Sequence, residues 1–108
     1  MLRKPIPPRM RSELSEDPYM TKCCLNYLEE CDGRIEWHHN LIYASKRVNE
    51  KWCILPVCHY HHTHESENKN LLNQEMVRRA SFQELAKYSK AIDYVALKRK
   101  VGVSGHRE

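Results

Sequence analysis

Two short segments near the middle of the chain have the patterns of β-strands. Polar and apolar residues alternate over residues 34–38, which is typical of a strand with one buried face. A mostly apolar run over residues 51–57 predicts a second strand, and we expect Pro56 to end it. The turn signal at residues 32–33 precedes the first strand, and residues 40–50 are predicted to form the loop between the two.

After residue 58 the pattern becomes helical. A short helix is predicted to run from there to about residues 68–70, and apolar residues then share one helical face over residues 71–76. Ser81 and Glu84 have the spacing of a capping box. The apolar positions that follow recur every three or four residues and predict one long amphipathic helix: Phe82, Leu85, Tyr88, Ile92 and Val95. Its apolar face is a candidate for pairing with a second copy of the chain.

The first residues of the chain are basic and rich in proline. We expect residues 1–20 to form an extended basic arm, either along a nucleic-acid groove or as a solvated terminus, because three prolines interrupt regular structure. Residues 21–70 are then a core, residues 71–102 a helical segment and residues 103–108 a frayed tail.

Composition and charge place broad limits on the class of protein. The chain has 108 residues, of which 41% are hydrophobic and 30% charged, which indicates one globular domain. Its net charge of +4 permits an anionic partner without demonstrating one. No apolar run approaches the ~20 residues of a membrane span, and the N-terminus lacks the pattern of a secretory signal. We therefore expect a cytoplasmic protein without a membrane partner.

All five cysteines and all but one of the seven histidines lie between residues 23 and 64. In a reducing compartment, such a mixture favours metal ligands over disulfides. Cys58 and His61 have the spacing of one zinc-binding pair, and Cys24 with Cys31 is a candidate for the other. Cys23 is an alternative to Cys24. The sequence therefore predicts a structural zinc site.

Two further stretches carry a resemblance to a known family. One is Glu36-Trp37-His38-His39, at the end of the first predicted strand, and the other runs from Leu55 to His62. A histidine pair on a strand, followed by a second strand and a histidine on a helix, resembles the HNH endonucleases and their ββα-metal fold. The stretch from Cys31 to His39 also resembles small phage and prophage HNH proteins. The resemblance covers about residues 23–64.

The resemblance implies roles for individual residues. His38 and His62 would bind the catalytic divalent metal ion, and His39 would be the general base that takes a proton from the attacking water. Cys58 and His61 would fall where the zinc-binding subclass has its second cysteine pair.

The chain departs from the family pattern at two positions. Cys53 stands where the family has its central asparagine, and Asn49 is the nearest candidate for that role. Ser66 stands at the closing histidine, with His64 and Glu65 near it but out of register. Either of these two is a candidate to complete the metal site.

These observations together predict an α+β protein with a small zinc-stabilised ββα-metal core and additional C-terminal helices. The expected function is hydrolysis of DNA phosphodiester bonds with Mg²⁺ or another divalent cation. The resemblance implies 5′-phosphate and 3′-hydroxyl ends and a role in phage DNA processing or recombination. The alternative is a zinc-stabilised nucleic-acid-binding module without catalysis. Basic residues beside the predicted site are candidates for phosphate contacts: Arg34, Lys46, Arg47 and Lys51.

Overall fold

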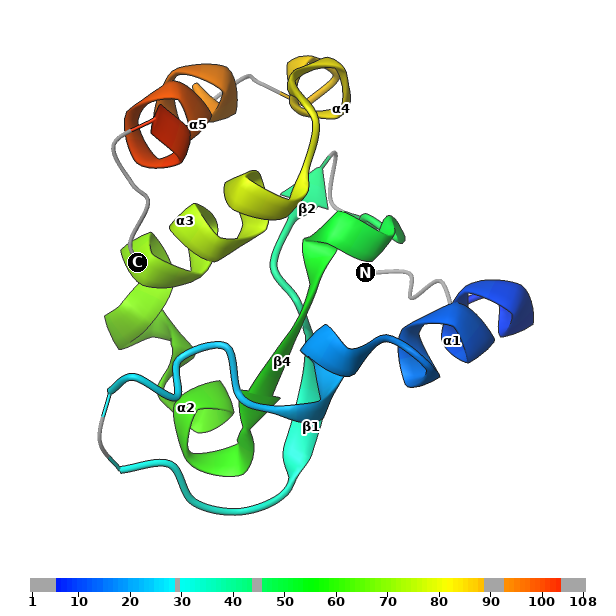
Figure 1. The fold of residues 1–108 in the computed structure, drawn as a ribbon, viewed down its shortest axis with the longest axis vertical. Coiled ribbons are helices and arrows are strands. Elements are labelled where there is room, and N and C mark those ends of the chain that lie inside the picture. Colours follow the sequence, from blue (N-terminus) through cyan, green and yellow to red (C-terminus); the bar gives the residue numbers. More distant parts are fainter. Residues whose placement is uncertain (1–5, 29, 44–45, 89–92, 104–108) are drawn as a thin grey trace.

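A hairpin of two antiparallel strands lies at the centre of the protein (Figure 1). Strand β1 (Ile35–His39) pairs with β4 (Ile54–Cys58), so that His39 lies opposite Ile54. The computed structural model describes residues 6–28, 30–43, 46–88 and 93–103. Helices and a small antiparallel sheet share one core, which confirms the α+β class.

Strand β4 is buried along its whole length. The expectation that Pro56 ends this strand is wrong, because the strand continues to Cys58. The Pro56 carbonyl accepts a hydrogen bond from the backbone N–H of Cys24 at 2.8 Å, on the edge of β4 away from β1. A proline is tolerated at such an edge, because no strand needs its missing N–H.

The connection between β1 and β4 contains regular structure that the sequence analysis did not predict. Strands β2 (Ile42–Tyr43) and β3 (Lys46–Arg47) form a second small antiparallel pair. The 3₁₀ turn η2 (Lys51–Cys53) then leads into β4, so the predicted second strand begins later than expected.

Helix α2 (His59–Thr63) begins directly where β4 ends. The 3₁₀ turn η3 (Glu65–Asn68) follows it, and helix α3 (Lys69–Arg79) comes next. The predicted helix after residue 58 is thus two short pieces. Leu72, Met76 and Val77 of α3 are fully buried in the main core.

The N-terminal segment is not an extended arm, and this expectation is wrong for its described part. Helix α1 (Pro8–Ser15) has a proline in its first turn, and the 3₁₀ turn η1 (Pro18–Thr21) follows. Proline is accommodated there because the first N–H groups of a helix have no internal partner. Leu14 of α1 is buried in a small cluster with Met20 and Ile54. Residues 1–5 of the expected arm lie outside the described residues.

Two separate helices replace the single long helix expected near the C-terminus. Helix α4 (Phe82–Ala86) has the predicted capping box, with both reciprocal contacts between Ser81 and Glu84 present. Helix α5 (Tyr94–Val103) begins after Asp93, whose side chain accepts a hydrogen bond from the backbone N–H of Ala96. The expected tail falls mainly on residues 104–108, which lie outside the described residues, as does the expected apolar position at Ile92.

Both C-terminal helices pack within the chain. Helix α5 contacts α3 and α4, and its residues Tyr94 and Val101 are buried in the main core. Leu85 of α4, on the face that we expected to pair with a second copy, is also buried in this core, whereas Phe82 is exposed. Pairing with a second copy stays a prediction. Among the described residues, no helix combines the length and apolar character that crossing a membrane requires.

Candidate functional site

Three thiols and one imidazole come together at the junction of β4 and α2. The ligand atoms of Cys23, Cys31, Cys58 and His61 all lie within 4.8 Å of one another. Nδ1 of His61 is 3.4 Å from Sγ of Cys23, 3.7 Å from Sγ of Cys31 and 3.3 Å from Sγ of Cys58. Three cysteines and one histidine are a common tetrahedral donor set for structural zinc. The cluster can therefore hold a metal ion.

Local backbone geometry brings these ligands together. Cys58 ends β4 and caps α2, where its Sγ accepts the N–H of His61, so the Cys-x2-His pair lies on one helical turn. The turn next to Cys31 is held against α2, because the Asp32 carbonyl accepts the N–H of Tyr60 at 3.0 Å. Gly33 has a φ of +90°, and a Cβ there would lie 2.6 Å from Cβ of His59. Only glycine allows this close approach.

The structure places Cys23 in this cluster instead of Cys24. Neighbouring side chains leave the backbone in different directions, and Cys24 points toward Tyr19 and Glu75. Burial, with the nearby Glu75 carboxylate, raises the pKa of Cys24 to about 12, which keeps it a neutral thiol. Cys53 is fully buried in the core, as a small apolar side chain.

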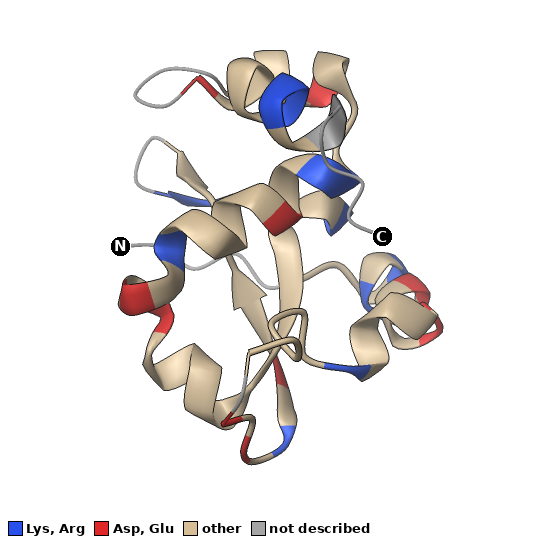
Figure 2. Ribbon diagram, turned by 60° about the vertical axis from the view of Figure 1, so that its left-hand side comes forward, with Lys and Arg blue, Asp and Glu red and all other residues tan. Residues whose placement is uncertain are grey.

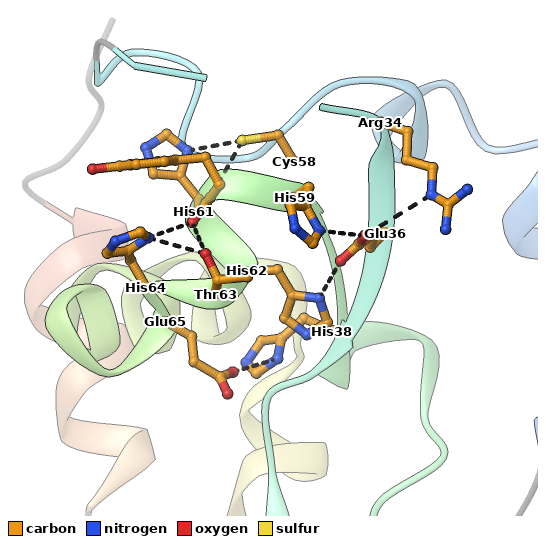
Figure 3. A network of polar contacts seen from close by, with 11 residues as sticks. Arg34, Glu36, His38, Cys58, His59, His61, His62, Thr63, His64 and Glu65 are labelled. Carbon is orange, nitrogen blue, oxygen red and sulfur yellow. Dashed lines mark hydrogen bonds and ion pairs between the residues drawn. The ribbon is translucent and has the colours of Figure 1, made fainter. Parts of the chain in front are cut away.

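A second cluster lies between the end of β1 and the start of η3. His38, His62 and Glu65 each offer a ligand atom within 4.8 Å of the others. Nδ1 of His38 is 2.8 Å from the Glu65 carboxylate, and the two imidazole rings are 5.3 Å apart (Figure 3). Two imidazoles and one carboxylate are a donor set for a divalent cation that leaves coordination positions open.

Glu65, and not His64, completes this cluster. Helix α2 ends at Thr63, so His64 begins a tighter turn and its side chain faces elsewhere. Its ring stacks on Tyr60 with centroids 4.2 Å apart, and its Nδ1 lies 2.8 Å from the Tyr60 carbonyl. His64 is therefore not part of this cluster, although the sequence made it a candidate metal ligand.

The Glu36 carboxylate orients His62. It accepts from Nδ1 of His62 at 2.7 Å and from Nδ1 of His59 at 2.9 Å (Figure 3). The hydrogen bond from His62, then that from His59, lowers the pKa of Glu36 and keeps it a carboxylate. With the proton on Nδ1, the lone pair of His62 is on Nε2, the nitrogen available to a metal.

Asn40 orients His38 in the same way. The Asn40 side chain is buried, with Oδ1 3.1 Å from Nε2 of His38 and Nδ2 donating to Oδ1 of Asn73 at 3.0 Å. Lys69, which can only donate, contacts the same Oδ1 at 3.2 Å, so this atom is an acceptor. Nε2 of His38 must therefore donate to Asn40.

In this tautomer Nδ1 of His38 carries no proton, so it faces the Glu65 carboxylate as one hydrogen-bond acceptor facing another. The lone pair on Nδ1 of His38 lies 2.8 Å from the Glu65 carboxylate, with no proton of its own to share. Burial lowers the pKa of His38 to about 4, although the Glu65 carboxylate opposes this shift. A second proton is thus absent at neutral pH, and a divalent cation bound by both atoms would satisfy their lone pairs. The residues present fit a bound metal ion.

We expect Asn40→Ala to weaken metal binding at this second cluster by about 10- to 100-fold, because loss of an orienting partner typically costs that much. Titration with Co²⁺ or Mn²⁺ by calorimetry, on protein whose Cys/His cluster is already loaded, measures the effect. Asn49→Ala is the matched control, because the Asn49 side chain contacts His39, which is not one of the three ligands. Equal affinities for Asn40→Ala and the unmodified protein would contradict this assignment.

His39 follows His38 on β1 and borders the same pocket. Its Nε2 lies 3.0 Å from Oδ1 of Asn49, which reaches it from the loop after β3. Burial lowers the pKa of His39, against the hydrogen bond with Asn49, and leaves the half-buried ring neutral. His38, His39 and His62 all line one pocket of about 560 Å³. A neutral imidazole with a fixed partner on one nitrogen can accept a proton on the other.

The four basic residues expected to contact nucleic acid do not lie together. Arg47 lines the pocket with His39, and Lys46 borders a neighbouring hollow. Lys51 instead pairs with Glu13 of α1 at 3.2 Å, and the exposed Arg34 lies 3.9 Å from Glu36. In the view of Figure 2, basic and acidic residues alternate along the described part of the ribbon.

Sequence reasoning missed Glu36 and Asn40, although a signal for both existed. Alternate residues of a strand share a face, which places Glu36, His38 and Asn40 on the same side of β1.

Comparison with family models, with curated proteins and with solved structures gives no match for this chain. Its function must therefore be argued from the geometry of the two clusters and of His39.

Proposed function

We propose that this protein is a metal-dependent endonuclease that hydrolyses DNA phosphodiester bonds. In this proposal β1, β4 and α2 form the ββα-metal unit of the HNH endonucleases, zinc occupies the Cys/His cluster, and a catalytic divalent cation binds His38, His62 and Glu65. The observation that carries the proposal is the position of His39. It is oriented by Asn49 and lines the same pocket as the three ligands.

The reaction requires a base and a site for negative charge. Cleavage of a phosphodiester proceeds by in-line attack of water through a state with additional charge on the phosphate oxygens. A bound divalent cation would neutralise that charge and stabilise the leaving 3′ oxygen. His39 accepts the proton of the attacking water through Nδ1, because Asn49 contacts its Nε2. Glu36 and Asn40 leave a lone pair on Nε2 of His62 and on Nδ1 of His38, where a metal could bind.

The donor set bears on the identity of the catalytic cation. Magnesium prefers an all-oxygen environment with several waters, whereas imidazole nitrogens suit transition metals. With two imidazoles and one carboxylate, we expect activity with Mn²⁺, Co²⁺ or Ni²⁺ to be at least as high as with Mg²⁺.

A plasmid-nicking assay on zinc-loaded protein tests the proposal. Supercoiled DNA should be converted to open-circular and linear forms when a divalent cation is added, and should remain supercoiled without it. Retarded plasmid in a gel, with no nicking under Mg²⁺, Mn²⁺, Co²⁺ or Ni²⁺, would contradict the proposal and favour the binding module.

A further inference from the structure

A second hollow lies on the opposite side of β1, against the N-terminal helix. Its volume is about 510 Å³, and its walls include Arg11 of α1, Arg47 of β3, Trp37 and His39. Figure 1 shows α1 on one side of the β1–β4 hairpin, with α2 and α3 on the other. The hollow is therefore separate from the three proposed metal ligands, none of which lines it.

The two guanidinium groups in this hollow have no acidic partner within the described part of the chain. Other cations of the same region do have one, because Arg9 and Lys51 both contact Glu13. Arg47 is also half-buried, and a cation withdrawn from water is stabilised by a bound anion. The hollow thus combines positive charge with space for a ligand.

His39 connects this hollow to the metal pocket. His39, Trp37 and Arg47 line both spaces, so the two meet at the end of β1. We propose that Arg11 and Arg47 bind a backbone phosphate of the nucleic acid adjacent to the one that is cleaved. The substrate then crosses the end of β1, with the scissile phosphate beside His38 and the neighbouring phosphate beside α1. This inference rests on the proposed function, because it assumes a nucleic-acid substrate.

Equilibrium binding without cleavage tests the subsite. The zinc-loaded full chain, without added catalytic metal, is titrated against a short fluorescent DNA duplex between about 50 and 200 mM salt. Each lost phosphate contact should reduce the slope of log affinity against log salt by about one. We expect that reduction for Arg11→Gln and for Arg47→Gln. Arg9→Gln is the matched control, because Arg9 lies on the same helix but pairs with Glu13 and lines none of this hollow.

The outcomes separate the subsite from the catalytic proposal. A reduced slope for Arg11→Gln with an unchanged slope for Arg9→Gln supports the subsite, even if the protein never nicks DNA. Equal slopes for Arg11→Gln, Arg9→Gln and the unmodified protein would overturn it. Competition with inorganic phosphate distinguishes the source of the anion. Phosphate binding that depends on Arg11, with no change in the DNA slope, would also overturn a nucleic-acid backbone as the occupant.

Discussion

Replacing Cys58 by serine is expected to remove one bound zinc ion and to unfold the domain at ordinary temperature. Cys58 ends β4, caps α2 and lies 3.3 Å from the imidazole of His61, so one residue joins the central strand to the helix that carries His62. Structural zinc contributes about 10–16 kcal/mol in zinc-finger peptides. Small domains are stable by only about 5–15 kcal/mol in total. Loss of the ion can therefore exceed the whole free energy of unfolding.

Zinc content by native mass spectrometry and thermal unfolding by circular dichroism measure this effect. Cys24→Ala is the matched control, because Cys24 is also buried but lies outside the cluster. It should keep one zinc ion and lose only about 1 kcal/mol of stability. Cys23→Ala should behave like Cys58→Ser. A cooperative unfolding transition and one full zinc equivalent in Cys58→Ser would show that the cluster does not hold the structural metal.

The strand β1 and the placement of its two histidines were predictable from the sequence alone. Alternation identifies a strand at residues 34–38, and the structure has β1 at Ile35–His39. The same alternation places His38 and His39 on opposite sides of it. The His38 ring then lies against Glu65 of η3 and the ring of His62, while His39 reaches Asn49, the nearest asparagine to the expected position. Short-range periodicity suffices here because a strand repeats every two residues, whatever packs against it.

The predictions were wrong where they assumed one unbroken helix. Counting four residues from His62 assumes an unbroken helix, but α2 ends at Thr63 and places Glu65 beside His38. The periodicity from Phe82 to Val95 likewise crosses the end of α4 at Ala86. The pattern of apolar positions shows which residues share a face, but it does not show where a helix ends. The choice between Cys23 and Cys24 depends on backbone direction in a turn, which periodicity does not describe.

Replacing His39 by alanine is expected to reduce DNA cleavage by about 10²- to 10⁴-fold, the usual contribution of a general base. Folding, zinc content and affinity for DNA should change little, because the ring is half-buried and is not among the ligands of either cluster. Rates of plasmid nicking under saturating Mn²⁺ measure the loss. Added imidazole should restore part of the rate, because His39 lines the pocket and its removal leaves a space that imidazole can enter.

Two further variants make this result specific to the base. His64→Ala removes an imidazole that stacks on Tyr60 and lines a different hollow, so nicking should continue at nearly the unmodified rate. Asn49→Ala leaves the base in place but removes its partner at 3.0 Å, so the rate should fall by less than in His39→Ala. If His39→Ala nicks DNA as fast as His64→Ala, the proton acceptor is another group. The metal cluster would then need a different base, and the role of Asn49 would be to hold the loop after β3 against the strand.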